Sequence, residues 1–383
     1  MMQKIYFFII FISIGYFTFA QDAYLDAKSE DVEKTYTGGE TYKVKTFNQK
    51  FKAKKPKNVV FLIGDGMGVS QVFAALTANK GHLYLENFKT VGFSKTQSAD
   101  KYITDSAAGG TALSTGVRTY NGAIGVDVNK QPVQTILEAA EEEGLATGLV
   151  STSAITHATP ASFIAHQESR SSSEEIAADF LKTDIDVFIG GGLDHFTKRK
   201  DGKDLTAELA QKGYQVETDI KKIKDIKSGK LAGLTAAGHN GRVEERGDML
   251  PVATTTALNI LSNNKKGFFL MIEGSQIDWG GHAGSAIYIV EEMLDFDQTI
   301  GKVLEFAAKD KNTLVVITAD HETGGMSLTG GNIAEGNVKA AFPTGGHTAV
   351  MVPVFAFGPG AEEFGGIMEN TEVNAKMRKL LLD

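Results

Sequence analysis

The feature that most constrains this chain is a series of short apolar segments, each followed by glycine or by polar residues. The first covers residues 58–63 and leads into Gly64-Asp65-Gly66, a pattern typical of a parallel strand buried on both faces. Similar segments follow at residues 146–150, 186–189, 267–272, 313–318 and 354–357, with helical patterns at residues 69–78, 132–143, 250–263 and 285–309. This alternation predicts one large α/β domain over residues 58–383, with a mainly parallel sheet covered by helices on both faces.

The N-terminal residues differ from the rest of the chain. Lys4 precedes an apolar run over residues 5–19, and Thr18 and Ala20 are small residues at the spacing that favours cleavage after Ala20. We therefore expect residues 1–20 to be a secretory signal peptide and the protein to be exported, either periplasmic or secreted. An uncleaved membrane anchor is the alternative.

Two further segments lack the strand–helix pattern. Residues 21–57 form a polar arm with seven lysines between Lys43 and Lys57, and residues 42–47 are candidates for a short edge strand. Residues 193–250 are charged, rich in lysine and weakly periodic, which indicates an insertion or lid. Whether this insertion covers a functional site is left open by the sequence.

The composition restricts the partners and the metal ligands. Acidic residues outnumber basic ones, 47 against 39, for a net charge of −8, which argues against a nucleic-acid partner. The chain has no cysteine, so metal ligands would be histidine, carboxylate and hydroxyl groups. No membrane segment is expected after signal cleavage. An anionic substrate would need a local positive site, which bound metal ions could supply.

Ser106 lies where an irregular segment is predicted to become a helix, with Asp105 before it and small residues after it. The backbone N–H groups and the dipole at a helix start attract an anion. Taken alone, the pair is more typical of an ordinary helix cap than of a nucleophile. A serine without a histidine base needs metal ions to activate it, so the interpretation depends on metal ligands elsewhere in the chain.

Seven acidic and histidine residues are candidates for such ligands. Most of them directly follow an apolar strand. A single strand-terminal Asp usually caps a helix, but loops do not ordinarily concentrate Asp and His in this way. Carboxylates with imidazoles suit Zn²⁺, and Mg²⁺ where oxygens predominate. The candidates are Asp65, Glu273, Asp278, His282, Asp320, His321 and His347, whereas His82, His166, His195 and His239 are expected to be structural or surface residues.

Asp278 and His282 are four residues apart, with Gly280 and Gly281 between them. The two glycines favour a loop that folds around an ion. Asp320 and His321 are adjacent at a strand end, where the chain can turn both toward one metal.

From about residue 57 to the C-terminus, the chain resembles an alkaline phosphatase. The resemblance rests on six segments that occur in the family's order, and their joint occurrence is highly specific. These segments are Gly64-Asp65-Gly66-Met67-Gly68, Thr104-Asp105-Ser106-Ala107-Ala108, Thr159-Pro160 with Arg170, Glu273-Gly274 to His282, Thr318-Ala319-Asp320-His321-Glu322 and Gly346-His347-Thr348.

The resemblance implies a site with two zinc ions and one magnesium ion. Asp278, His282 and His347 would hold one zinc, while Asp65, Asp320 and His321 would hold the second, beside Ser106. Asp65, Thr159 and Glu273 would hold the magnesium. These assignments come from the family pattern and are expectations for this chain.

The resemblance also implies hydrolysis of small phosphate monoesters through a phosphoserine at Ser106, with release of inorganic phosphate. Arg170 would bind two phosphoryl oxygens through its fork of donors, beside Asp105. Two metal ions roughly 4 Å apart would stabilise the attacking and leaving oxygens. By the same resemblance, the protein would be a homodimer.

The sequence departs from the best-known bacterial pattern at two positions of the site. His157 replaces an Asp, which leaves open whether the third metal is magnesium or zinc. Trp279 replaces a Lys that would be close to the phosphate. Two alternatives to a monoesterase stay open: a diesterase or sulfatase of the same superfamily, and an exported protein that binds phosphate or metal without turnover.

Overall fold

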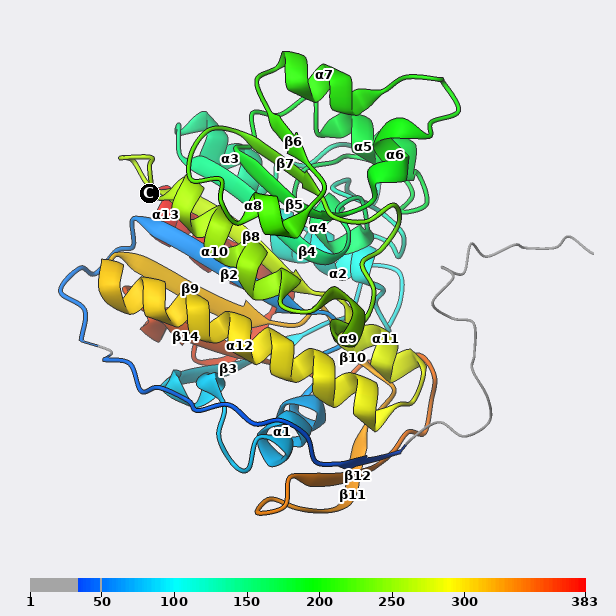
Figure 1. Ribbon diagram of the computed structural model, residues 1–383, viewed down its shortest axis with the longest axis vertical. Coiled ribbons are helices and arrows are strands. Elements are labelled where there is room, and N and C mark those ends of the chain that lie inside the picture. The colour runs from blue at the N-terminus through cyan, green and yellow to red at the C-terminus, as the bar shows by residue number, and fades with distance from the viewer. Residues whose placement is uncertain (1–33, 49) are drawn as a thin grey trace, which may run out of the picture.

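The computed structural model describes residues 34–48 and 50–383, so the predicted signal peptide and the first part of the predicted arm lie outside it. Its centre is a ten-stranded sheet (Figure 1). In spatial order the strands are β15 (Gly366–Glu369), β3 (Thr90–Lys95), β14 (Val352–Phe357), β9 (Thr313–Thr318), β2 (Asn58–Gly64), β8 (Phe268–Gly274), β4 (Ala146–Ala154), β5 (Val187–Gly191), β7 (Leu231–Leu234) and β6 (Gln215–Glu217).

Most neighbouring strands in this sheet are parallel, as predicted. β2 pairs in parallel with β8 and β9, and β4 pairs in parallel with β8 and β5. β14 runs antiparallel to β3 and β9. All residues of β2, β4, β8 and β9 are buried, which explains why these strands carry mainly apolar or small side chains on both faces.

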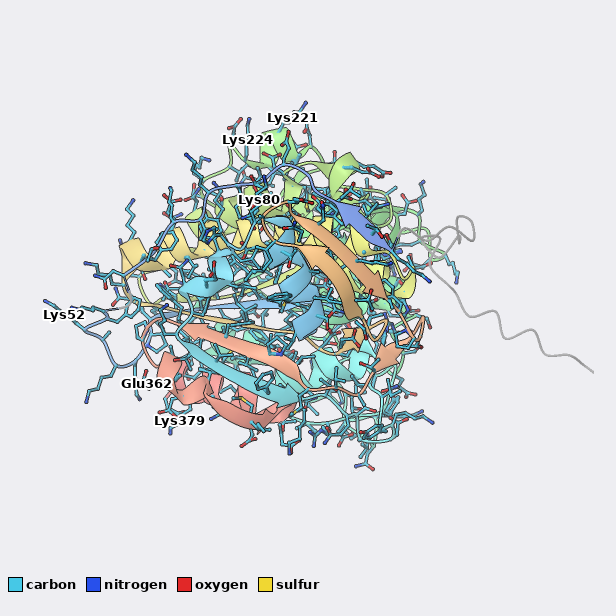
Figure 2. The ribbon with its side chains drawn as sticks, turned by 90° about the horizontal axis from the view of Figure 1, so that it is seen from below. Lys52, Lys80, Lys221, Lys224, Glu362 and Lys379 are labelled. Atoms are coloured by element: carbon cyan, nitrogen blue, oxygen red, sulfur yellow. The ribbon has the colours of Figure 1, made fainter. Side chains whose placement is uncertain are left out.

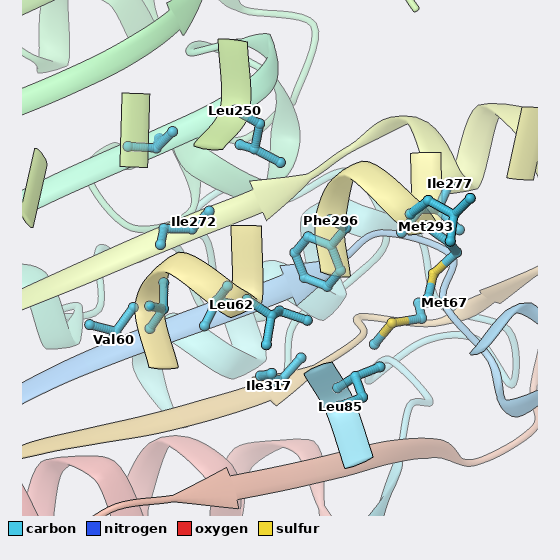
Figure 3. Packing of buried hydrophobic residues seen from close by; sticks show 14 of the residues in the cluster. Val60, Leu62, Met67, Leu85, Leu250, Ile272, Ile277, Met293, Phe296 and Ile317 are labelled. Carbon is cyan, nitrogen blue, oxygen red and sulfur yellow. The ribbon is translucent and has the colours of Figure 1, made fainter. Parts of the chain in front are cut away.

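Helices cover both faces of the sheet, which confirms the predicted α/β class. Leu62 of β2, Ile317 of β9 and Phe296 belong to one core cluster and lie side by side in Figure 3. The helices over this face are α1 (Val69–Ala78), α10 (Met249–Leu261) and α12 (Ala286–Asp310), and those on the opposite face include α2 (Ser106–Thr115), α3 (Ile136–Glu142), α5 (Ser173–Asp179) and α13 (Asn370–Leu381).

Helix α3 begins later than the sequence predicts. The prediction placed its start at Pro132, but Pro132 forms an isolated bridge with Val126. The helix begins at Ile136 because Thr135 and Glu138 form a reciprocal capping box, each accepting a hydrogen bond from the other's backbone N–H.

The N-terminal arm crosses the surface without the edge strand expected at residues 42–47. Its strand is instead β1 (Thr35–Thr37), which joins a small sheet with β12 (Asn337–Ala341) and β11 (Ser327–Asn332). Side chains hold the following segment: the Tyr42 hydroxyl donates to Asp297 at 2.6 Å, and Asn87 binds the backbone at Phe47. The 3₁₀ helix η2 (Tyr84–Asn87) contacts this segment through Tyr84, whose ring stacks on that of Tyr42 with centroids 5.9 Å apart.

Residues 193–250 contribute to the main sheet through β6 and β7. Around these strands lie α6 (Leu193–Thr197), α7 (Leu205–Gln211), α8 (Ile220–Ile223) and α9 (Val243–Arg246). Figure 2 shows Lys221 and Lys224 of this region, together with Lys52 of the arm, extending from the surface. Among the residues that the structure describes, no helix is long and apolar enough to cross a membrane.

Candidate active site

The predicted site residues gather at the carboxyl ends of three neighbouring strands, the edge of an α/β sheet where ligands bind. Asp65 follows β2, Glu273 lies at the end of β8, and Asp320 lies just past β9. Because β2 pairs with both β8 and β9, the register alone brings these carboxylates to one place. All three side chains are buried.

Asp278 and His282 lie on a short helix, α11 (Gln276–His282), so the expected loop around an ion is wrong. The two glycines serve packing instead. A Cβ on Gly280 would lie 2.8 Å from the backbone N of Ile289 in α12, and one on Gly281 would lie 2.8 Å from the backbone O of Thr323. Asp278 and His282 are four residues apart in this helix, so their side chains lie on the same side of α11.

Asp278, His282 and His347 form the first cluster, with potential ligand atoms all within 4.8 Å of one another. His282 Nδ1 donates to the carbonyl of Gly345 at 2.7 Å, and His347 Nδ1 donates to that of Thr104 at 2.9 Å. The carbonyls thereby orient both rings with Nε2 toward the cluster, and the two Nε2 atoms lie 3.2 Å apart. Histidine ligands of metals are commonly oriented in this way.

The second cluster contains Asp65, Asp320 and His321, and Ser106 lies beside it. His321 Nε2 lies 3.2 Å from Ser106 Oγ, 3.4 Å from Asp65 Oδ1 and 3.2 Å from Asp320 Oδ2. His347 stacks on His321 with ring centroids 3.5 Å apart, so the first two clusters are contiguous.

The electrostatics of these buried groups favour a cation. Burial, followed by the charges of Asp320 and Asp278, raises the pKa of Asp65 well above its ordinary value. Burial, with the charges of Asp278 and Glu273, raises the pKa of Asp320 to about 8. Burial and the neighbouring His347 lower the pKa of His321 well below its usual range. Bound cations would stabilise both carboxylates in their charged form.

Asp65, His157 and Glu273 form the third cluster. Thr159, in α4 (Ala158–Ala161), is fully buried, and its hydroxyl forms no hydrogen bond with the residues that the structure describes. A second set of residues, to which the sequence assigned no role, surrounds the other side of Glu273. Its Oε2 accepts hydrogen bonds from Ser151 at 2.5 Å, Ser275 at 2.6 Å and Ser153 at 3.3 Å. The only sequence signal for these hydroxyls is their position at strand ends.

Several buried oxygens in the clusters accept no hydrogen bond from any residue that the structure describes. They are both oxygens of Asp65, Oε1 of Glu273 and Oδ2 of Asp320. Buried carboxylate oxygens are normally satisfied, so these four atoms fit metal ligands. The donor set of carboxylate and imidazole groups also fits zinc and magnesium.

Asp105 performs two tasks beside Ser106. It is the N-cap of α2, accepting a hydrogen bond from the backbone N–H of Ala108 at 3.0 Å, and its other oxygen pairs with Arg170 Nη1 at 3.2 Å. The helix-cap alternative and the functional interpretation are therefore compatible. Arg170 Nη2 in turn lies 3.1 Å from His157 Nε2, which connects this pair to the third cluster.

Trp279 is buried, with 3% of its surface exposed, and packs near His157 with ring centroids 6.3 Å apart. Of the histidines expected to be structural or on the surface, His82 is exposed, and His166 and His195 bind Glu138 and Thr156. His239 is half-buried and packs against Trp279 and His157, which is a structural position beside the third cluster.

Comparisons with known proteins point to one family. The family model for alkaline phosphatase matches residues 56–342. Alkaline phosphatase 4 of Bacillus subtilis (strain 168) is 36% identical, over 82% of this chain and 87% of that protein. Alkaline phosphatase of Escherichia coli (strain K12) is 32% identical, over 86% of each chain.

Solved structures give the same result. The alkaline phosphatase from the Antarctic bacterium TAB5 superposes with a TM-score of 0.82 and 45% identity, covering 86% of this chain and 99% of that one. A variant of that enzyme is described with Mg bound in its M3 site, with a TM-score of 0.81 at the same identity and coverage.

Proposed function

The chain belongs to the alkaline phosphatase family and is a metal-binding hydrolase of phosphate monoesters, and we propose that its nucleophile is Ser106. One observation carries this proposal: Ser106 Oγ lies at the start of α2 and beside the Asp65–Asp320–His321 cluster. The substrates would be small phosphate monoesters, and the product inorganic phosphate.

The three clusters define the proposed metal sites. Asp278, His282 and His347 would hold one Zn²⁺, and Asp65, Asp320 and His321, with the Ser106 hydroxyl, would hold a second. Asp65, Thr159 and Glu273 would hold Mg²⁺, or Zn²⁺ because of His157. The buried oxygens without hydrogen-bond donors among the described residues support this fit. When bound, these cations supply Lewis-acid chemistry that lowers hydroxyl pKa values and neutralises charge on phosphoryl oxygens.

The protein's own groups would bind and orient the phosphoryl group. Arg170 would donate two hydrogen bonds from its fork to two phosphoryl oxygens, a geometry that lysine cannot provide. Asp105 holds one side of that fork, which supports a fixed orientation of the guanidinium group. The first backbone N–H groups of α2 add a positive field at Ser106.

The reaction would then proceed in two displacements. Ser106 Oγ loses its proton and attacks phosphorus, the bond to the ester oxygen breaks, and the alcohol departs after taking up a proton. Water next gives up a proton and attacks the phosphorus of the phosphoserine, the bond to Ser106 breaks, Ser106 Oγ takes up a proton, and inorganic phosphate leaves. Both steps use the same arrangement of Arg170 and the α2 terminus.

We propose further that the protein is exported, to the periplasm or outside the cell, and that it is a homodimer. The predicted signal peptide supports the first statement. The second rests on the family resemblance. Residues 58–383 would form the catalytic domain, with the insertion at about residues 193–250.

Covalent labelling tests the proposed nucleophile. The metal-loaded enzyme is mixed with a phosphomonoester labelled at phosphorus, quenched in acid and digested, and the modified peptide is identified by mass spectrometry. We expect the label on Ser106. Turnover without covalent label under conditions that trap acid-stable phosphoserine would argue against it. Rates on an aryl diester and an aryl sulfate, measured in parallel, distinguish a monoesterase from the superfamily alternatives.

A further inference from the structure

His157 and Trp279, where this chain departs from the best-known bacterial pattern, both pack against His239. The ring centroids of His239 and Trp279 lie 5.0 Å apart at an interplanar angle of 83°, and those of His239 and His157 lie 5.3 Å apart at 85°. Edge-to-face contacts of this kind are favourable between aromatic rings. His239 therefore supplies the surface against which both other rings are placed.

A backbone hydrogen bond fixes the His239 ring. Its Nδ1 lies 3.0 Å from the backbone N of Ala154, the last residue of β4. Because a backbone N–H can only donate, Nδ1 must accept, and the neutral ring carries its proton on Nε2. The bond also ties His239 to the strand end from which the chain continues to His157.

The loop that carries His239, between β7 and α9, is held on both sides. On one side, Gly238 O accepts a hydrogen bond from Gly192 N at 2.6 Å. On the other, Asn240 O accepts one from Gln276 Nε2 at 2.9 Å, and Gln276 begins α11, the helix of Trp279. These bonds leave the ring little freedom to move away from its two partners.

The contacts of His157 extend the effect to the proposed phosphate ligand. His157 Nε2 lies 3.1 Å from Arg170 Nη2, while the opposite nitrogen of the guanidinium group pairs with Asp105. A shift of the His157 ring would therefore change the support on one side of the Arg170 fork.

We propose that His239 is a positioning residue of the active site. Its ring holds Trp279 and His157 in place and, through His157, orients Arg170 toward the phosphoryl group. This inference rests on the proposed role of Arg170 in binding phosphate. Residues 193–250 would thereby contribute to the active site, because their loop places His239 against His157 of the third cluster.

The chain's only tryptophan makes the proposal testable without turnover, because intrinsic tryptophan fluorescence reports on Trp279 alone. His239→Asn keeps an acceptor for the Ala154 N–H but removes the ring, and His239→Ala removes both. In each variant, with metal and after chelation, we expect a red-shifted emission and stronger quenching by acrylamide than in the wild type. His82→Ala, at an exposed histidine, serves as the control and should match the wild type.

Inhibition by inorganic phosphate measures the effect on Arg170. In the metal-loaded His239→Asn variant we expect the inhibition constant to rise by about tenfold, at the low end of losses for outer partners of active-site ligands. The change in kcat should be smaller. If His239→Asn showed the same emission, acrylamide quenching and phosphate inhibition as the wild type, the proposal would be overturned.

The outcome is separable from that of the labelling experiment. Altered Trp279 emission and weakened phosphate binding in His239→Asn would support positioning even if no phosphoserine forms on Ser106. Conversely, label on Ser106 together with an unchanged His239→Asn variant would retain the nucleophile and remove the role of His239.

Discussion

The carboxylate of Glu273 illustrates how single residues prepare this site. Three serine hydroxyls bind its Oε2, while its Oε1 accepts no hydrogen bond from the described part of the chain. One oxygen is thus satisfied within the protein and the other is left for a ligand. Outer hydrogen bonds of this kind orient metal-binding carboxylates.

Replacing Ser106 by alanine should abolish the covalent intermediate and lower kcat by on the order of 10³-fold or more, leaving a residual rate from the rest of the site. The fold and metal content should be unchanged, since Asp65, Asp320 and His321 remain as ligands of the second proposed site. Steady-state kinetics with an aryl phosphate and elemental analysis would measure both. Ser327→Ala, at an exposed position in β11, is the matched control, and equal activity of the two variants would exclude Ser106 as nucleophile.

Replacing Trp279 by lysine should tighten inhibition by inorganic phosphate. A lysine here adds a cation near the product, and about 1.4 kcal/mol of attraction corresponds to about tenfold in affinity. Product release should slow, since phosphate leaves a more positive site. The melting temperature should fall, because the variant loses a ring that is buried against His157 and His239. Unchanged or weaker phosphate binding in a folded, metallated variant would contradict the electrostatic interpretation.

At the scale of elements, α12 connects the regions that surround the site. It packs on α11, which carries Asp278 and His282, and on α10. It also binds α9 through Arg246, whose guanidinium group pairs with Glu292 at 2.7 Å and with Asp295 at 2.6 Å in a buried cluster. A substitution that shifts α12 should therefore displace both α11, which carries Asp278 and His282, and α9 of the insertion.

Arg246→Met tests this connection. The substitution leaves Glu292 and Asp295 buried without their cation, a change that typically costs about 3–5 kcal/mol of unfolding free energy. Urea unfolding would measure the loss. Lys198→Ala, which breaks an exposed pair with Asp194, should cost no more than about 1 kcal/mol. If both variants lost a similar free energy of unfolding, the buried ion pairs of Arg246 would stabilise the fold no more than the exposed pair of Lys198.

The contact between the arm and α12 should make stability depend on pH. Burial raises the pKa of Asp297 to about 6, against the opposing hydrogen bonds from Tyr42 and the backbone of Tyr84 and Leu85. Because the folded-state pKa lies above the ordinary value of 3.8, this contribution to stability is complete below about pH 4 and is lost as the pH rises through 6.

Asp297→Asn removes this titration. Between pH 4 and pH 7, the unfolding free energy of the wild type should fall relative to that of the variant by about 3 kcal/mol, for a shift of about two pKa units. Urea titrations of the metal-free proteins would give this difference directly. A difference that is constant over the range would show that Asp297 titrates normally.

At the scale of the whole molecule, the proposed metal ions join distant parts of the chain. The first two clusters draw on residues just after β2, in α11, just after β9 and in the two-residue strand β13 (His347–Thr348), which pairs with β10 (Glu322–Thr323). Ions bound there would stabilise the folded state, which alone brings the ligands together.

Chelation should therefore lower activity and the melting temperature together. Zinc with magnesium should restore both, and sodium at equal ionic strength should restore neither. Calorimetry and activity of the same chelated samples provide the measurement. Full activity after verified removal of all metal would rule out the proposed mechanism.

Much of the fold could be predicted from local patterns. The apolar segments at residues 58–63 and 313–318 correspond to β2 and β9, and the long apolar stripe at residues 285–309 corresponds to α12. The errors arose where other interactions outweighed a local signal. The Thr135–Glu138 capping box displaced the helix start from Pro132, and side-chain hydrogen bonds held residues 42–47 without a strand partner.

For the site, the sequence by itself determined which groups are present: the carboxylates and histidines after the apolar segments, and Ser106 at a helix start. Parallel strands end at the same edge of a sheet, so the local pattern predicts that Asp65, Glu273 and Asp320 lie at one edge. The pairing of β2 with β8 and β9 then brings them together. Only the tertiary structure decided that Asp278 and His282 lie on a helix, that three serines bind Glu273, and that His239 lies against Trp279. These contacts join segments far apart in the chain, and their geometry depends on packing and hydrogen bonds that no local pattern encodes.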